Sequence, residues 1–148
     1  MRRMWGLLAV FLLAASAPAE EGVTIDATNF PDTAFRDYVK DEWDKDNNGT
    51  LSGEEIATVD FDADVSGKDI ESLKGIEHFK ELKKLYCFNN RLTELDVSKN
   101  TALVYLYCST NRLTALDVSK NTKLKGLHCE KKPPHVPRSG RAWRSGFD

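Results

Sequence analysis

The feature that most constrains the fold of this chain is a 21-residue repeat in its second half. The first copy, Leu82 to Ala102, reads LKKLYCFNNRLTELDVSKNTA, and the second, Leu103 to Lys123, reads LVYLYCSTNRLTALDVSKNTK. A third copy begins at Leu124 as LKGLHCE and then breaks off. A fixed period of this length predicts a solenoid, because no single unit can bury its apolar face until a neighbour stacks on it.

Each copy fits the leucine-rich repeat pattern L-x-x-L-x-L-x-x-N-x-L, with cysteine at the third apolar position. The alternation of Leu85 and Cys87 with Tyr86 and Phe88 predicts a short strand whose leucine and cysteine point inward. Asn90 follows at the turn, where its amide is suited to bind backbone groups. Equivalent residues should stack in columns: Leu85, Leu106 and Leu127; Cys87, Cys108 and Cys129; Asn90 and Asn111.

The strand residues that point away from the core form the predicted partner-binding face. Aromatic side chains in register on an exposed surface are typical of recognition sites. Sheet propensity alone is the alternative explanation for the same residues. The predicted binding residues are Lys84, Tyr86, Phe88, Tyr105, Tyr107, Ser109, His128 and Glu130.

A second motif, DKDNNGTLSGEE at residues 44–55, matches the twelve-residue EF-hand calcium loop. Gly49 stands at the sharp turn, and Leu51 is the apolar anchor. The predicted metal ligands are Asp44, Asp46, Asn48, Thr50 through its carbonyl, Ser52 directly or through water, and Glu55 with two oxygens. This number of hard oxygen ligands favours Ca²⁺ over Mg²⁺. The alternative is a polar Asn-Gly turn that binds no metal.

The chain contains one such loop and no second one at pairing distance, so we expect a structural ion rather than a calmodulin-like switch. Between Glu20 and Asp60 there are twelve acidic and three basic residues, which suggests a cation partner rather than nucleic acid. We assign 20–60 to a helical cap, with an amphipathic helix predicted from Thr33 to Trp43. The repeats are assigned to 61–129, with a divergent first unit from Ala63 to Glu81.

The first nineteen residues read as a signal peptide. Arg2 and Arg3 precede an apolar run from Gly6 to Ala15, and small residues up to Ala19 offer a cleavage site. That run is too short to cross a membrane, and no second one follows, so we expect a secreted or cell-surface protein without a transmembrane segment. Its three cysteines are expected to be buried and reduced, because equivalent positions on neighbouring parallel strands fit disulfide geometry poorly.

Residues 130–148 depart from the repeat and carry five basic and two acidic residues. Two interpretations remain open: a disordered basic tail, or the truncated end of a longer array.

The motifs DKDNNGTLSGEE, VSGKDIESLKGIEHF and LYCFNNRLTELDVSKNTAL resemble those of secreted bacterial leucine-rich repeat proteins of the internalin type, over roughly Val23 to Glu130. The resemblance implies an α/β solenoid, a horseshoe of about three parallel-strand repeats with an EF-hand-like cap. It also implies a non-catalytic module, expected to be monomeric, that binds a protein or cell-surface ligand. A calcium-stabilised architectural segment without its own ligand is the alternative. An enzyme is disfavoured because His78, His128 and His135 stand in no catalytic motif.

Overall fold

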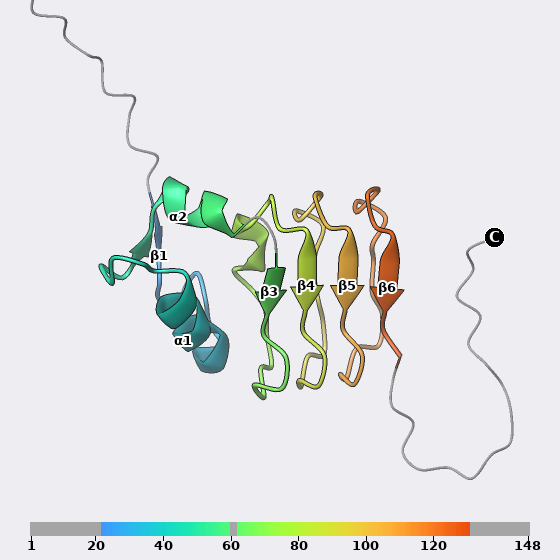
Figure 1. The fold of residues 1–148 in the computed structure, drawn as a ribbon. Coiled ribbons are helices and arrows are strands. Elements are labelled where there is room, and N and C mark those ends of the chain that lie inside the picture. The colour runs from blue at the N-terminus through green and yellow to red at the C-terminus, as the bar shows by residue number, and fades with distance from the viewer. Residues whose placement is uncertain (1–21, 60–61, 131–148) are drawn as a thin grey trace, which may run out of the picture.

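The computed structural model describes residues 22–59 and 62–130 (Figure 1). The predicted signal peptide at 1–19 and the basic segment beyond Glu130 therefore lie outside the described residues. The described part has two regions: an N-terminal region with two short helices, and a row of four parallel strands beside it (Figure 1). In these two ranges no helix is both long and apolar enough to cross a membrane.

The N-terminal region contains β1 (Val23–Thr24), α1 (Thr33–Glu42), β2 (Thr50–Leu51) and α2 (Gly53–Thr58). Strands β1 and β2 pair antiparallel. Helix α1 begins after Asp32, whose carboxylate accepts a hydrogen bond from the Phe35 N–H at 2.9 Å, as an N-cap residue does. The predicted helix from Thr33 is present, and Phe35 and Val39 lie on its buried face.

The repeats contribute β3 (Asp62–Asp64), the 3₁₀ helix η1 (Ile76–His78), β4 (Lys84–Tyr86), β5 (Tyr105–Tyr107) and β6 (Gly126–His128). The four strands form one parallel sheet in chain order. Leu85 is aligned with Leu106 and Leu106 with Leu127, which is the register that the repeat period predicts. Our count of about three strand-bearing repeats falls one short of the strands described, because the divergent first unit and the incomplete last unit each contribute a strand.

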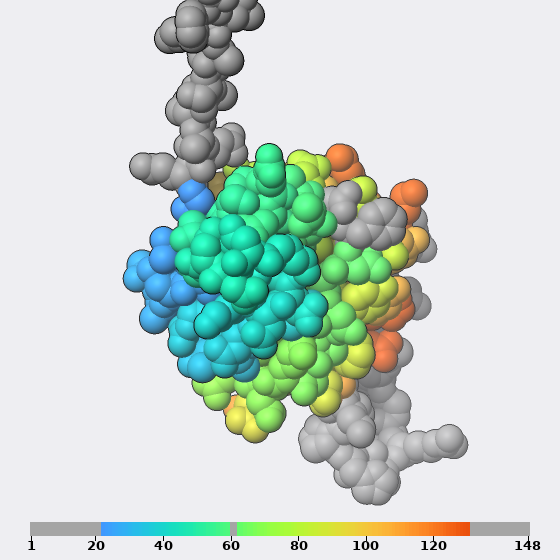
Figure 2. All heavy atoms as spheres, turned by 60° about the vertical axis from the view of Figure 1, so that its left-hand side comes forward, coloured from blue at the N-terminus to red at the C-terminus, as the bar shows by residue number. Residues whose placement is uncertain are grey.

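The N-terminal region packs against the first repeat (Figures 1 and 2). The Trp43 and Phe79 rings have centroids 4.3 Å apart, and Phe30 lies against His78 at 6.0 Å. Gly75, at φ +107°, allows Phe30 to approach closely, since a Cβ at Gly75 would collide with the Phe30 ring. These contacts bury the apolar side of the first repeat, which a solenoid needs at its end.

Two columns of asparagines hydrogen-bond successive repeats. Asn90 accepts bonds from the Lys68 and Ile70 N–H groups and donates to the Val65 carbonyl, as the turn position predicts. A second column, Asn100 and Asn121, was not predicted. Asn100 is fully buried and donates through Nδ2 to the carbonyls of Ile76 and Phe79, and Asn121 repeats this on Val97 and Asn100. The repeated asparagine of SKN was the available signal.

The cysteine column needs one correction. Cys87 and Cys108 are buried, as predicted, but Cys129 is exposed. Each inward side chain of one repeat is covered by the next, and among the described residues no repeat follows β6. Burial raises the pKa of the Cys87 thiol well above its usual value and raises the pKa of Cys108 to about 12, because the thiolate is desolvated. No described cysteine is in a disulfide.

Candidate functional site

The acidic loop between α1 and β2 folds back on itself at two residues with positive φ. Gly49 has φ +80° and Asn47 has φ +55°, a conformation that glycine and asparagine adopt at low cost. The loop then enters β2, where Leu51 is fully buried and aligned with Val23. The Ile25 N–H donates to the Gly49 carbonyl at 2.9 Å. The turn and its apolar anchor thus tie the loop to the body of the N-terminal region.

Three carboxylates converge inside this loop. Oxygen atoms of Asp44, Asp46 and Glu55 all lie within 4.8 Å of one another. Asp44 is only 2% exposed, and its two oxygens accept hydrogen bonds from the N–H groups of Asn48 (3.1 Å) and Gly49 (2.9 Å). These backbone donors fix the carboxylate and offset part of its desolvation.

Glu55 is positioned by the start of α2. Ser52 is the N-cap, and Ser52 and Glu55 form a capping box in which Glu55 Oε2 accepts from Ser52 N and Oγ, both at 2.9 Å. Glu55 Oε1 accepts from the Lys45 N–H at 2.7 Å, across the loop. The hydrogen bonds from Ser52, with those from Lys45 and Asp46, lower the pKa of the Glu55 carboxyl below its usual value. Glu55 is therefore held ionised at the mouth of the loop.

The remaining predicted ligands are near the cluster but are engaged with the chain. The Asn48 side-chain oxygen accepts from the Thr50 N–H at 2.7 Å, and its Nδ2 donates to Asp46 Oδ2 at 2.7 Å. Ser52 Oγ is held in the capping box. Thr50 lies in β2, aligned with Thr24. The donor set is entirely oxygen, which suits a hard divalent cation such as Ca²⁺.

A second candidate site is the outer face of the parallel sheet, where side chains of four strands stand in three rows. All eight predicted binding residues lie in these rows. The rows also contain three residues of β3 and its continuation, and one glycine, that were not among the predicted binding residues. The alternation of Asp62, Asp64 and Ser66 with Ala63 and Val65 was the available signal for the first three. The rows are Asp62, Lys84, Tyr105 and Gly126; Asp64, Tyr86, Tyr107 and His128; and Ser66, Phe88, Ser109 and Glu130.

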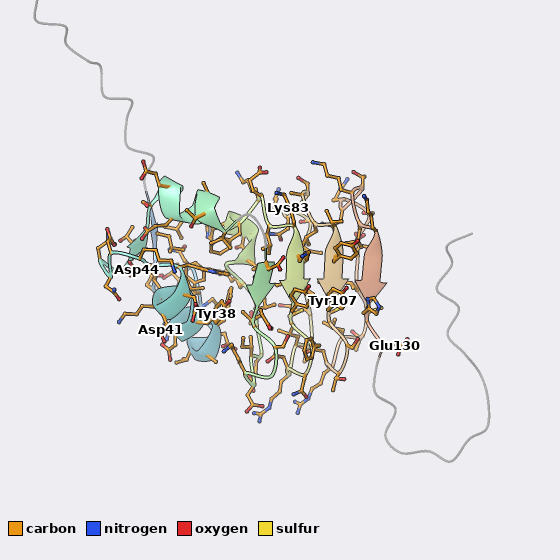
Figure 3. The ribbon with its side chains drawn as sticks, viewed as in Figure 1. Tyr38, Asp41, Asp44, Lys83, Tyr107 and Glu130 are labelled. Carbon is orange, nitrogen blue, oxygen red and sulfur yellow. The ribbon has the colours of Figure 1, made fainter. Side chains whose placement is uncertain are left out.

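The middle row is a column of stacked rings (Figure 3). Tyr86 and Tyr107 have centroids 4.8 Å apart and planes 10° apart, and Tyr107 and His128 are 4.6 Å and 13° apart. The spacing equals the distance between neighbouring strands, so the planes stand upright on the sheet and present their edges to solvent. Tyr105 stacks against Tyr107 at 6.5 Å. Each ring restricts its neighbours, which lowers the entropy lost when a ligand binds.

Two neighbours shape this column. Gly126 leaves room for Tyr105, because a Cβ at Gly126 would lie 2.7 Å from Tyr105 Cδ1. Phe88 is the one large apolar side chain that is exposed within the described ranges, at 43%. The face thus combines hydroxyl-bearing rings with an open apolar ring, a composition typical of protein interfaces.

The β3 side of the face is acidic. Asp62 and Asp64 are exposed, and Lys84 Nζ lies 3.3 Å from Asp62 Oδ1. Tyr38 of α1 lies at the β3 side of the sheet (Figure 3), where its hydroxyl is close enough to Asp64 to be affected by its charge. Burial raises the pKa of the Tyr38 hydroxyl, and the carboxylates of Glu42 and Asp64 raise it further. The N-terminal region therefore contributes one wall to the acidic end of the sheet face.

Comparison with known proteins agrees with this fold. A family model described as Leucine Rich repeats (2 copies) matches residues 80–121. Internalin J of Listeria monocytogenes is 41% identical to this chain over 72 residues, which are 49% of this chain and 8% of that protein. The chain therefore carries leucine-rich repeats and has an internalin-like relative.

Solved structures show the same relationship. The functional domain of internalin J, described as including a cysteine ladder, superposes with a TM-score of 0.67 at 38% identity, over 75% of this chain and 24% of that one. The internalin InlF of the same species superposes with a TM-score of 0.64 at 25% identity, over 76% of this chain and 34% of that one. Internalin C2 superposes with a TM-score of 0.61 at 21% identity, over 73% of this chain and 48% of that one. At this identity the match shows the fold alone. The chain spans less than half the length of each of these proteins.

Proposed function

We propose that this protein is a secreted, non-catalytic leucine-rich repeat module that binds a protein ligand on its outer sheet face and is stabilised by Ca²⁺. The observation that carries the binding proposal is the stacked column of Tyr86, Tyr107 and His128 beside exposed Phe88. Rings fixed in register by the sheet are pre-organised for contact, and aromatic residues dominate binding energy at interfaces.

Secretion is proposed from the first nineteen residues, whose charged, apolar and small-residue segments follow the order of a signal peptide. The proteins that the sequence motifs resemble are secreted bacterial proteins, which agrees with this proposal. Export should leave a mature protein that begins at Glu20, and N-terminal sequencing of material from the medium of a bacterial host is the measurement. A secreted protein that still begins at Met1 would contradict cleavage at this site.

The cysteine column is proposed to be the counterpart of the cysteine ladder named for internalin J. Cys87 and Cys108 lie on neighbouring strands, and the Cys87 N–H donates to the Tyr107 carbonyl while the Cys108 N–H donates to the His128 carbonyl. Both thiols are buried and both have raised pKa values. Their role in this proposal is packing as small apolar side chains rather than nucleophilic chemistry.

Calcium is proposed to bind the loop through Asp44, Asp46, Asn48 and Glu55, with the Thr50 carbonyl and Ser52 completing the set. Support comes from the three converging carboxylates, from the backbone donors that fix Asp44, and from an all-oxygen donor set. The ion would neutralise mutual repulsion between carboxylates that lie within 4.8 Å. It would thereby link the end of α1 to the start of α2.

The calcium proposal predicts a higher melting temperature in millimolar Ca²⁺ than in chelator. At tenfold excess over Kd, linkage raises the unfolding free energy by about 1.4 kcal/mol. Glu55→Gln should abolish the difference, because it removes one converging carboxylate. Glu54→Gln is the matched control, since Glu54 is exposed and outside the cluster. Equal melting temperatures for wild type with and without Ca²⁺ would contradict the proposal.

The binding proposal is tested by panning a displayed peptide library on the immobilised full chain. Wild type should enrich sequences that lose binding to the Tyr86→Ala, Tyr107→Ala double variant, because truncating a fully used interfacial aromatic costs about 2 kcal/mol or more. The control is Thr114→Ala with Thr93→Ala, two exposed residues of the return segments. If every enriched peptide binds the double tyrosine variant as tightly as wild type, the outer sheet face is not the binding surface. That result would favour the alternative, an architectural segment without its own ligand.

A further inference from the structure

The aromatic column is incomplete at its β3 end. Its four register positions are Asp64, Tyr86, Tyr107 and His128, and only the last three carry rings. Tyr107 covers one face of the Tyr86 ring, at 4.8 Å. On the other side stands Asp64, which is exposed and much shorter than a tyrosine. Among the described residues Tyr86 is in ring contact with Tyr107 alone, so no described ring covers its other face above Asp64, and Tyr38 of α1 lies next to Asp64.

The floor of this open position carries negative charge. Asp64 Oδ1 accepts from the Ser66 N–H at 3.0 Å, and the Asp64 side chain is exposed. The nearest lysines are engaged elsewhere: Lys84 pairs with Asp62 at 3.3 Å, and Lys68 Nζ lies 5.2 Å from the centroid of the Tyr38 ring. A carboxylate below and an aromatic face beside it together favour a planar cation.

We propose that this position is a receptor site for one arginine side chain of a partner protein, stacked on the free face of Tyr86 and paired with Asp64. The inference rests on the proposed binding function and specifies the chemistry of the ligand. A guanidinium can take the place of the missing ring, since it is flat, stacks on aromatic faces and donates two parallel hydrogen bonds to a carboxylate. A lysine ammonium is strongly hydrated and cannot stack.

A carbohydrate fits the same face less well. Sugars bind aromatic side chains through open ring faces, whereas Tyr107 has both faces covered by Tyr86 and His128. The one free face of Tyr86 is beside a carboxylate, where a cation gains more than a neutral hydroxyl does. The charge and the ring geometry together therefore favour a basic protein segment.

The probe for this site is the blocked tripeptide Gly-Arg-Gly, titrated into the full chain at low ionic strength and followed by NMR. The arginine side-chain protons should move upfield as they enter the ring current of Tyr86, and the shifts should saturate. The isosteric citrulline peptide, which lacks the charge, and the lysine peptide, which cannot stack, should each bind about 2- to 5-fold more weakly, the range of an exposed charge pair.

Two aspartates give a matched pair of variants. Asp64→Asn should weaken the arginine peptide about 2- to 5-fold. Asp117→Asn should leave it unchanged, because Asp117 Oδ1 accepts the same kind of local bond, from the Ser119 N–H, but lies outside the strands and their outer face. Tyr86→Leu should remove the upfield shift. Lack of saturation, equal binding of the lysine peptide, or insensitivity to Asp64→Asn would each overturn the arginine site.

The two experiments together distinguish a failure of the arginine site from a failure of the proposed protein-binding surface. If panned peptides depend on Tyr107 but not on Asp64, the outer sheet face is still the binding surface and the arginine site is wrong. If the arginine peptide binds through Asp64 while no panned peptide depends on the tyrosines, the cation site is present but the proposed protein-binding surface is not.

Discussion

The two ends of the solenoid contain the same kinds of residues and differ in what covers them. At the N-terminal end, Val65, Ile70 and Leu73 of the first repeat belong to the same buried cluster as the core residues of α1 and are at most 3% exposed. At the other end, equivalents of buried core residues are only half-buried; these are Leu116, Val118, Leu124 and Leu127. Burial in this fold is therefore decided by the neighbouring repeat, not by the pattern within one repeat.

The polar core behaves differently from the apolar core at the same two ends. The buried asparagines donate toward the preceding repeat: Asn100 to Ile76 and Phe79, and Asn121 to Val97. Asn121 in the last full repeat is consequently still 3% exposed and hydrogen-bonded, although Leu127 beside the following turn is only half-buried. Each repeat is thus held to the preceding repeat by hydrogen bonds, and its apolar side chains are buried by the repeat that follows.

The largest expected contrast between the ends is in thiol reactivity. Cys129 should react with a maleimide in the folded protein at least about 100-fold faster than Cys87, because a buried thiol reacts only after the structure opens. The raised pKa values of Cys87 and Cys108 slow them further, since the thiolate is the reacting species. Mass spectrometry of the labelled peptides over time gives the three rates. Slow labelling of Cys129 would show that the C-terminal end is covered in the full chain.

The next contrast is in the leucine column. Leu106→Ala should lower the unfolding free energy by about 2–5 kcal/mol, as a deletion in a closed core does. Leu127→Ala, at the aligned position of β6, should cost less, about 1–2 kcal/mol, because Leu127 is only partly buried and no described repeat covers it. Denaturant titration measures both. Equal losses would break the distinction between the two ends.

The smallest contrast concerns how the N-terminal region is attached. Asp32 caps α1 through Oδ1, and its Oδ2 accepts from the N–H groups of Glu71 (2.7 Å) and Ser72 (3.2 Å) in the first repeat. Asp32→Ala should therefore cost about 1–3 kcal/mol, through the lost cap and two unpaired donors. Asp26→Ala is the control, because Asp26 bonds only locally, to Thr28 and Asn29. A thermal melt in which both variants lose the same stability would argue against Asp32 as a link between the two regions.

Much of the site could be predicted from residue spacing alone. The period of 21 places Tyr86, Tyr107 and His128 in one row, and a twelve-residue loop places Asp44 and Glu55 together. Asp62 and Asp64 were not among the predicted binding residues, because the first repeat departs from the 21-residue period that identified the other positions. Gly126 was missed for a similar reason: its role is the space it leaves for Tyr105 on the neighbouring strand.

The sequence by itself determined which residues point inward, because a strand alternates and a repeat returns each residue type to the same place. It also predicted that the carboxylates of Asp44, Asp46 and Glu55 come together, because their spacing matches a loop that turns back on itself. Only the tertiary structure decided which inward residues are buried, since Cys87 and Cys129 occupy the same place in the pattern and have opposite exposure. It likewise decided that, among the described residues, Tyr86 is stacked on a ring on one side only, because the aligned residue of the neighbouring strand is Asp64.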